Sequence, residues 1–306
     1  MARAVRFDHY GDIDVLSIAD VDIPHPQAGE VAVKVRAAGI NPGEASIRKG
    51  LLHARFPATF PSGEGTDFAG VATEVGDGVD SITVGDEVMG WTEGRASQAE
   101  YVVVPGDQLI DKPAALSWEV AGSLFVVGVT AYAAVRAVGA GPGDTVVVSA
   151  AAGGVGSVTV QLLRIRGASV VGIASEANHE WLRSVGVEPV AYGDGLADRI
   201  RAAAPVGVDA FIDLFGEEYV RLAVELGVDP DRIETIIAWE AAAEVGAKAE
   251  GSATASTAGV LTEMAGYVAS GQIVVPIAAT YPLDQVREAY TQLERRHTRG
   301  KIVLIP

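Results

Sequence analysis

The sequence contains no cysteine among its 306 residues. Disulfide bonds, catalytic thiolates and zinc sites built on cysteine are therefore excluded by composition alone. The five histidines show no spacing typical of metal ligands, and we read most of them as surface residues. No metal site is expected.

Positive charge is also scarce. The chain has 23 Lys and Arg against 40 Asp and Glu, which gives a formal net charge of -17 at pH 7. A surface this acidic repels nucleic-acid phosphates and anionic lipids. We therefore expect a soluble protein with no nucleic-acid partner and no membrane partner.

Long apolar stretches are missing as well. The uncharged run Val120–Val135 is shorter than the roughly 20 residues of a membrane-spanning helix and is interrupted by glycine and polar residues. It is predicted to form a buried helix. Residues 1–8 are charged and contain no apolar stretch of the kind that begins a secretory signal. The expected location is the cytoplasm.

The first 110 residues favour short strands separated by turns. Val31, Val33 and Val35 alternate with less apolar residues, which is the period of a half-buried strand. Glycine–aspartate pairs supply the turns. This pattern predicts a compact barrel or sandwich, with strands at Arg3–Asp8, Val31–Ala37, Val71–Val75, Glu87–Trp91 and Tyr101–Val104.

From Ala121 to about Ser270, helical segments alternate with short strands. Such alternation predicts a parallel sheet covered by helices on both faces. A helix is predicted at Val155–Arg166, and strands at Thr145–Ser149, Ala168–Ala174, Pro189–Tyr192, Val208–Leu214 and Ile233–Ala238. The Ala/Gly/Ser-rich stretch Ala241–Thr257 is predicted to be a mobile surface segment.

Beyond Ile273 the pattern returns to strands around one helix, in which Val286, Ala289, Tyr290 and Leu293 share a face. The chain is therefore predicted to leave its first domain, build a second one, and return.

The strongest chemical signal is the glycine loop of the segment Thr145–Gly156. Ala151 takes the first glycine position of a dinucleotide fingerprint, Gly153 and Gly156 take the others, and Gly154 is an additional glycine. The loop follows a predicted strand and opens a predicted helix, as the motif requires. Gly153 and Gly154 allow the backbone to approach a pyrophosphate, and the amides of Gly154 and Val155 would point at it.

The choice of nicotinamide cofactor stays open at the level of residues. Glu176 lies twenty residues beyond Gly156, where a carboxylate would bind the ribose hydroxyls of NAD. Ser175, Asn178 and His179 surround it and can donate hydrogen bonds to the 2′-phosphate of NADP.

Several segments together resemble the zeta-crystallin-like quinone oxidoreductases, a zinc-free branch of the medium-chain dehydrogenase/reductase superfamily. Besides Ala-Ala-Gly-Gly-Val-Gly, these are Ala38-Gly-Ile-Asn-Pro42, Pro61-Ser-Gly-Glu-Gly-Thr-Asp-Phe-Ala-Gly70, Val84-Gly-Asp-Glu-Val88, Gly128-Val-Thr-Ala-Tyr132 and Thr298-Arg-Gly-Lys-Ile-Val-Leu304. The resemblance implies an α/β fold in which a doubly wound Rossmann sheet is inserted in a GroES-like β-barrel domain. The expected domains are residues 1–118 with 273–306, and residues 119–272.

The resemblance also implies a cofactor site. It suggests NADPH, with NADH as the alternative, bound by Asn41, Thr130, Gly153, Gly154, Val155, Gly156, Ser175, Asn178, His179, Tyr192, Phe215, Ile237 and Ala238. Lys301 is left between two positions, facing the cleft or capping the last strand. Glu64 and Asp67 are interpreted as structural.

Zinc-dependent relatives hold their metal through a cysteine where this chain has Asn41, and the histidine of their His-Glu pair is missing at Gly63-Glu64-Gly65. We therefore expect a zinc-independent reductase that transfers hydride to quinones or α,β-unsaturated carbonyls, substrates that contain their own electron sink. The pocket is predicted from Ser46, Leu52, His53 and Trp239. No proton donor is identified. The alternatives are a 2-enoyl thioester reductase and a low-turnover NADPH-binding or redox-sensing protein. The family implies a homodimer, with Ile233–Ala238 as a candidate edge strand.

Overall fold

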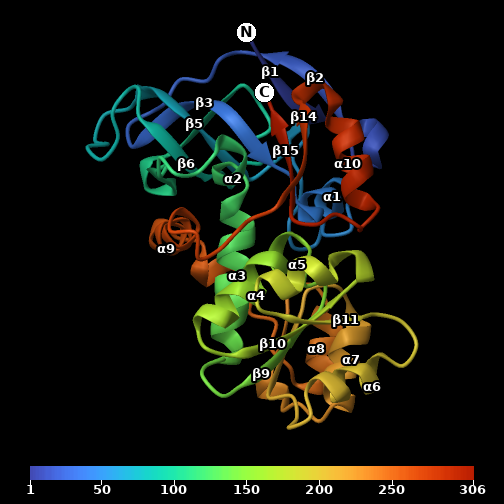
Figure 1. Ribbon diagram of the computed structural model, residues 1–306. Coiled ribbons are helices and arrows are strands. Elements are labelled where there is room, and N and C mark those ends of the chain that lie inside the picture. Colours follow the sequence, from blue (N-terminus) through green and yellow to red (C-terminus); the bar gives the residue numbers. More distant parts are fainter. The chain divides into compact units, whose positions relative to one another are not determined.

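The computed structural model describes all 306 residues, and they form two compact units (Figure 1). Unit 1 comprises Met1–Val126, Thr257–Ala269 and Ile277–Pro306, and unit 2 comprises Val127–Ser256 and Ser270–Pro276. The predicted boundaries at residues 118 and 273 stay a prediction. No helix is both long enough and apolar enough to cross a membrane.

Unit 2 is built on a five-stranded parallel sheet in the order β11-β10-β9-β12-β13. Its strands are β9 (Thr145–Val148), β10 (Ser169–Ala174), β11 (Glu188–Ala191), β12 (Ala210–Asp213) and β13 (Ile233–Thr235). All four residues of β9 are buried, as expected for a central strand covered on both faces. The chain runs outward from β9 to β11 and then crosses back to β12, so the strand order reverses between β9 and β12.

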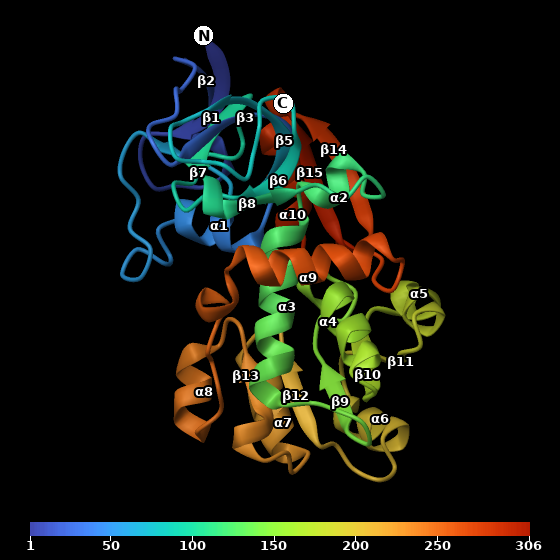
Figure 2. The same cartoon turned by 90° about the vertical axis from the view of Figure 1, so that its left-hand side faces the viewer.

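Helices cover both faces of this sheet. The helices that lie wholly in unit 2 are α4 (Gly154–Ile165), α5 (His179–Ser184), α6 (Leu196–Ala203), α7 (Glu217–Glu225) and α8 (Trp239–Val245). Ile200 of α6 and Ala223 of α7 pack on Val147 and Phe211 in one buried cluster. In Figures 1 and 2, α4 lies on the opposite face from α6 and α7.

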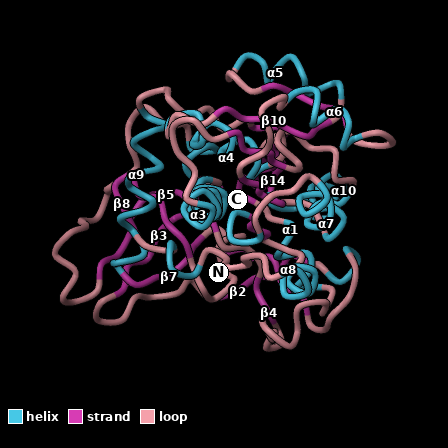
Figure 3. The backbone as a smooth tube through the Cα atoms, turned by 90° about the horizontal axis from the view of Figure 1, so that it is seen from below, coloured by secondary structure: helices cyan, strands magenta, loops and turns pink.

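Unit 1 holds the remaining strands. A seven-stranded sheet has the order β14-β15-β3-β5-β6-β8, with β7 paired to β3, and a smaller sheet has the order β2-β1-β4. The strands are β1 (Ala2–Phe7), β2 (Ser17–Val21), β3 (Glu30–Gly39), β4 (Ser62–Gly63), β5 (Asp67–Val75), β6 (Glu87–Trp91), β7 (Tyr101–Pro105), β8 (Leu109–Asp111), β14 (Ile277–Pro282) and β15 (Lys301–Ile305). Figure 3 shows β3, β5, β7 and β8 gathered together.

The C-terminal strands complete the sheet that the N-terminal strands begin. β15 pairs with β3 in antiparallel register, with Val303 opposite Gly39 and Leu304 opposite Ala38. The helices of this unit are α1 (Pro42–Arg48), α2 (Trp118–Ala121), α9 (Ala258–Ala269) and α10 (Val286–Glu294), while α3 (Leu124–Val138) begins in unit 1 and continues into unit 2. The predicted return of the chain is therefore found, and the face of Val286, Ala289 and Tyr290 is buried.

The structure differs from the sequence predictions at two places in residues 233–257. The strand predicted over Ile233–Ala238 ends at Thr235. The stretch 241–257, predicted to be a mobile surface segment, includes the last five residues of α8 and a short 3-10 turn at Ala253–Ala255, with Ala241, Ala242 and Ala255 buried. Small side chains allow this segment to pack closely, which composition alone does not reveal.

The outer edge of β13 is also not open along its length. Lys248 forms a parallel bridge with Glu234, and its backbone exchanges hydrogen bonds with Ile233 and Thr235. The strand predicted to pair with a second copy of the chain is therefore already paired, in part, with the residue Lys248 of its own chain.

Candidate functional site

The turn between β9 and α4 has the shape of a phosphate cradle. Ala150 adopts a left-handed backbone conformation with φ of 47°, and its carbonyl accepts a hydrogen bond from the Gly153 amide at 2.9 Å. Gly153 precedes the first residue of α4, and no side chain caps this end of the helix. The first amides of α4 therefore have no side-chain acceptor, which is the condition under which a helix N-terminus binds an anion.

Gly156 allows α4 to approach the end of β9. A Cβ atom on this residue would lie 2.9 Å from the carbonyl carbons of Ala150 and Ala151, closer than real Cβ atoms come to backbone. The third glycine of the fingerprint is thus required by close packing of helix against strand. A pyrophosphate fits this cradle, which Gly153, Gly154, Val155 and Gly156 would form.

Three buried polar side chains link the carboxyl ends of three neighbouring strands. The Ser149 hydroxyl, just past β9, donates to Asp213 Oδ1 at 2.8 Å, and the Thr235 hydroxyl at the end of β13 donates to Asp213 Oδ2 at 2.7 Å. All three are fully buried. The Ser149–Asp213 bond joins β9 to β12, where the strand order reverses and where open α/β sheets bind their ligands.

Asp213 also binds backbone. Its Oδ1 accepts hydrogen bonds from the amides of Phe215 at 2.9 Å and Gly216 at 3.1 Å. Burial raises the pKa of the Asp213 carboxyl, while these hydrogen bonds oppose the shift. The carboxyl therefore ties the loop that follows β12 to the edge of the sheet.

The residues predicted to distinguish NADP from NAD lie together after β10. Ser175 is followed by a 3-10 turn over Glu176–Asn178, and Asn178 Nδ2 donates to Ser175 Oγ at 3.0 Å. Glu176 is exposed, whereas the Nε2 atom of His179 is buried without a hydrogen-bond partner. The structure thus brings the competing groups into one turn at the carboxyl end of the second strand.

The other predicted cofactor residues of unit 2 are spread over several elements. Thr130 is buried within α3, and Tyr192 lies exposed just beyond β11. The Phe215 ring packs edge-on against Tyr219 at 5.6 Å between centroids. Ile237 and Ala238 were predicted to end a strand, but they lie in the loop between β13 and α8, because β13 ends at Thr235, three residues earlier than expected. Their contact with a cofactor stays a prediction.

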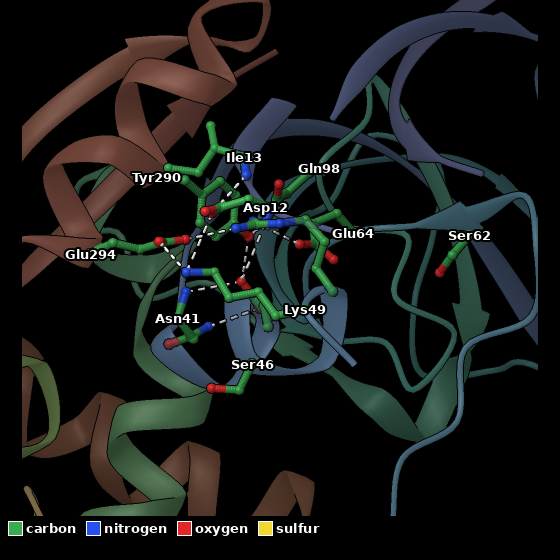
Figure 4. A network of polar contacts seen from close by, with 12 residues as sticks. Asp12, Ile13, Asn41, Ser46, Lys49, Ser62, Glu64, Gln98, Tyr290 and Glu294 are labelled. Carbon is green, nitrogen blue, oxygen red and sulfur yellow. Dashed lines mark hydrogen bonds and ion pairs between the residues drawn. The ribbon is translucent and has the colours of Figure 1, made fainter. Parts of the chain in front are cut away.

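Unit 1 contains a buried polar network around Asn41 (Figure 4). The Asn41 side chain donates to Glu44 Oε1 at 3.0 Å and to Asp67 Oδ2 at 3.2 Å, and its Oδ1 accepts from Lys301 Nζ at 2.5 Å. Both amide hydrogens face carboxylates and the amide oxygen faces an ammonium group, so this network fixes the orientation of the amide.

Lys301 is the first residue of β15, and its side chain is buried among polar groups of unit 1. It is 3% exposed, and its Nζ also binds the Ile40 carbonyl at 3.1 Å and lies 3.4 Å from Asp67 Oδ2. All three ammonium hydrogens can therefore be satisfied inside unit 1. Asp67 also accepts from the Val126 amide at 2.8 Å, which supports the structural interpretation given to it.

Glu44 is the most heavily bonded carboxylate of this network. It accepts from the Asn41 backbone at 2.9 Å, from Thr66 N at 3.0 Å and from the Tyr290 hydroxyl at 3.0 Å, and Gln98 Nε2 lies 3.3 Å away. Burial raises the pKa of Glu44, and the nearby Asp67 charge adds to the rise, while the Asn41 bonds oppose it.

The surroundings of Glu64 differ from those of Glu44. Neither of its oxygens receives a hydrogen bond, and the nearest cationic atom, Arg48 Nη1, lies 3.6 Å away. Burial, and next the charge of Glu44, raise the pKa of Glu64 well above its ordinary value. Arg48 is itself fully buried, stacks over the Tyr290 ring and binds Glu294 at 2.6 Å.

The network reaches the surface through Glu294. Its second oxygen binds Lys49 at 2.5 Å, and Lys49 lies 3.4 Å from the exposed Asp12. The ion pairs at this end join α1 to α10, elements far apart in the chain. Figure 4 shows Lys49 between Glu294 and Asp12.

The predicted pocket residues of unit 1 do not join this network. The Ser46 hydroxyl donates to the Pro42 carbonyl inside α1 at 3.2 Å. Leu52 is half-buried, and the exposed His53 binds the Tyr10 hydroxyl through Nδ1 at 2.7 Å. Trp239 begins α8 in unit 2. A substrate contact for these residues stays a prediction.

Comparison with known proteins defines the family. Residues 27–114 match the alcohol dehydrogenase GroES-like domain, and residues 185–304 match the zinc-binding dehydrogenase family. The rat synaptic vesicle membrane protein VAT-1 homolog is 30% identical over 319 residues, covering 92% of this chain and 78% of that protein. The chain belongs to the medium-chain dehydrogenase/reductase superfamily. The predicted α/β fold, with a GroES-like domain and a parallel Rossmann sheet, is confirmed.

Quinone oxidoreductases are among the relatives of this superfamily member. The rat quinone oxidoreductase is 28% identical, covering 99% of this chain and 96% of that protein. The structure of the quinone oxidoreductase from Coxiella burnetii is 29% identical with a TM-score of 0.89, covering 100% of this chain and 99% of the other. The protein is an oxidoreductase enzyme of a family that uses NAD(P).

The zinc site that gives part of the superfamily its name does not fit the residues of this chain. Where metal-dependent relatives have a cysteine, Asn41 binds the Lys301 ammonium, so a cation is already present among the carboxylates. No group of three or more His, Asp or Glu side chains is placed to hold a metal ion.

Sequence reasoning missed several residues of both sites. Glu44 has a local signal, since Asn41, Pro42 and Glu44 take the N-cap, first and third positions of α1, where a glutamate reaches back to the N-cap amide. Arg48, Tyr290 and Gln98 have no local signal, because their partners lie between 54 and 246 residues away. Asp213 also has a local signal, because it is a carboxylate at the end of a buried strand.

Proposed function

We propose that this oxidoreductase transfers hydride from NADPH to quinones or α,β-unsaturated carbonyl compounds. The observation that carries the proposal is the uncapped N-terminus of α4, which meets the glycine turn beside the strand-order reversal of a parallel sheet. The quinone oxidoreductases among the relatives support the acceptor class.

The geometry at Ser175 supports NADPH over NADH. Ser175 Oγ accepts a hydrogen bond from Asn178, so the hydroxyl hydrogen remains available to donate to a phosphate oxygen. His179 offers a further buried nitrogen without a partner in the same turn. The exposed carboxylate of Glu176 opposes a phosphate, so the preference is expected to be moderate.

A reduced nicotinamide supplies the hydride, and quinones or enones accept it together with one proton. Because these substrates contain their own electron sink, the chain has to orient the reactants and exclude water, without a nucleophile of its own. We propose that Gly153, Gly154, Val155 and Gly156 bind the pyrophosphate, and that Phe215, Ile237 and Ala238 border the nicotinamide half.

The activity test measures oxidation of NADPH and NADH with 1,4-benzoquinone, 9,10-phenanthrenequinone, an enone and a 2-enoyl thioester. Turnover with quinones or the enone, faster with NADPH, is the expected result. Turnover confined to the thioester would replace the proposal with the enoyl thioester reductase. Tight NADPH binding without any turnover would replace it with a binding or sensing role.

The cofactor assignment is tested by two substitutions in one turn. Ser175→Ala should weaken the binding of NADPH by roughly tenfold and leave the binding of NADH nearly unchanged, since only the 2′-phosphate loses a hydrogen-bond donor. Glu176→Gln should strengthen the binding of NADPH, because it removes a carboxylate that opposes the phosphate. Ser184→Ala, an exposed serine later in the same helical region, is the matched control. Tighter binding of NADH than of NADPH by the wild-type protein would reverse the assignment.

We further propose a cytoplasmic homodimer, as the family resemblance implies. Light scattering coupled to size-exclusion chromatography tests the dimer. A monomer at micromolar concentration would contradict it.

A further inference from the structure

We infer that Asp213 is a positioning residue, which shapes the nicotinamide side of the nucleotide site by holding two strand-end loops in place. This inference rests on the proposed function, because it assumes that NADPH binds at the carboxyl edge of the unit 2 sheet. Asp213 itself is fully buried, so it acts through the loops that it holds.

The donors and acceptors around Asp213 can be assigned in only one consistent way. Ser149 Oγ accepts from the Leu214 amide at 2.7 Å, so its single hydrogen points to Asp213 Oδ1. Thr235 Oγ1 accepts from the Ala238 amide at 3.0 Å, so its single hydrogen points to Asp213 Oδ2. A carboxylate that only accepts matches these donors, whereas a side chain with a donor of its own does not.

Every one of these bonds ends on a loop that follows a strand. After β12, Asp213 accepts directly from the amides of Phe215 and Gly216, and it holds the Leu214 amide through the Ser149 hydroxyl. Through Thr235 it holds the amide of Ala238 after β13, and the Ile237 amide lies 3.3 Å from the same hydroxyl. The backbone of both loops thus depends on one buried carboxylate.

The two loops belong to one half of the nucleotide site. In a doubly wound sheet the first strand–helix–strand unit, here β9-α4-β10, binds the adenosine and pyrophosphate, and the strands across the reversal bind the other half of the dinucleotide. β12 and β13 lie across the reversal. Asp213 should therefore influence nicotinamide binding and leave the adenosine half unaffected.

This separation provides a test that does not depend on activity. Binding of NADPH is compared with binding of adenosine 2′,5′-bisphosphate, which contains the adenosine and its 2′-phosphate but no nicotinamide, by calorimetry on the full chain. Asp213→Asn keeps one acceptor oxygen but turns an amide donor toward the Thr235 hydroxyl. Thr235→Val removes that hydroxyl, and Thr235→Ser restores it. Thr145→Val, at the buried opposite end of β9, is the matched control.

Asp213→Asn and Thr235→Val should each weaken NADPH binding about tenfold or more, because one buried hydrogen bond is lost on the nicotinamide side only. The dissociation constant of adenosine 2′,5′-bisphosphate should change less than about twofold. Thr235→Ser should bind both ligands like the wild-type protein, and so should Thr145→Val. If Asp213→Asn does not fold, the Thr235 pair carries the test.

Equal losses for both ligands would overturn the inference, since Asp213 would then support the whole unit and not one half of the site. Unchanged NADPH binding in Thr235→Val would overturn it too. Failure of the wild-type protein to bind NADPH would overturn the proposed function and this inference together, an outcome recognisable before any variant is made.

Discussion

At the scale of single residues, the buried carboxyls of this protein show how much their partners matter. Asp213 and Glu44 each accept several hydrogen bonds, whereas the two oxygens of Glu64 accept none. Burial raises the pKa of all three. A buried group stabilises the fold only when its hydrogen bonds replace those lost to water, so residues of the same type differ in their contribution.

Tyr290→Phe should destabilise the protein by about 1–3 kcal/mol. The substitution removes a hydroxyl that donates to Glu44 and accepts from Gln98 Nε2 at 2.8 Å, and it leaves both buried groups short of a partner. Urea unfolding measures the change. Tyr101→Phe is the control, because Tyr101 is half-buried and lies outside the network. Loss of its hydroxyl should lower the free energy of unfolding by less than about 0.5 kcal/mol. Equal stability of the two variants would contradict the prediction.

At the scale of elements, the helix–strand contact at the glycine turn sets the geometry of the nucleotide site. α4 approaches β9 so closely that only a residue without Cβ fits at position 156. The same contact aims the first turn of α4 at the carboxyl edge of the sheet. Packing and ligand binding therefore depend on one element boundary.

Gly156→Ala should destabilise the protein by about 1–3 kcal/mol and weaken NADPH binding, because α4 must move away from the backbone of Ala150 and Ala151. Unfolding and calorimetry measure the two effects. Gly141→Ala is the control, since a Cβ there meets no atom within 4 Å. A Gly156→Ala protein with wild-type stability and affinity would show that the turn adapts without cost.

The segment after α8 is attached to β13 by a carboxyl that titrates near neutrality. Both oxygens of Glu234 lie within reach of the Glu250 amide, at 3.1 and 3.3 Å. Burial raises the pKa of Glu234 to about 7. The folded state therefore holds this proton more tightly than the unfolded state does.

This shift predicts a stability contribution with a definite sign. Between the ordinary pKa of 4.5 and the folded value of about 7, the folded state binds more protons, so stability falls as the pH rises. Glu234→Gln cannot ionise, and it should gain stability relative to the wild-type protein by up to roughly 3 kcal/mol from pH 5 to pH 8. Unfolding in urea across this range measures the difference. The exposed Glu240→Gln is the control, and a constant difference between wild type and Glu234→Gln would contradict the shift.

At the scale of the whole molecule, stability and ligand binding are linked by mass action. The acidic composition, with a net charge of -17, does not help an anionic cofactor to bind, so the local amides and hydroxyls of unit 2 must supply the affinity. Binding to the folded state alone should then be visible as increased resistance to unfolding.

NADPH at one hundred times its dissociation constant should raise the free energy of unfolding by about 2.7 kcal/mol. Urea unfolding with and without the nucleotide measures the increase, and AMP at the same concentration serves as the control. Absence of any increase with NADPH or NADH would contradict nucleotide binding by the folded protein.

The sequence by itself determined the features that depend on short stretches of chain. The glycine turn, the parallel strands around it and the absence of cysteine could all be recognised locally, because each follows from consecutive residues or from composition. The secondary structure within residues 241–257 was not predicted, because small residues fit a helix, a turn or a loop and only their neighbours decide which.

The tertiary structure alone decided which polar groups meet. Lys301 and Asn41 are 260 positions apart, and Ser149 and Asp213 are 64 apart, yet each pair shares a buried hydrogen bond. No local pattern records such pairings, because they arise when strand order and chain return bring distant segments together. In the interior, where water cannot replace a missing partner, those pairings fix side-chain orientations that the sequence leaves open.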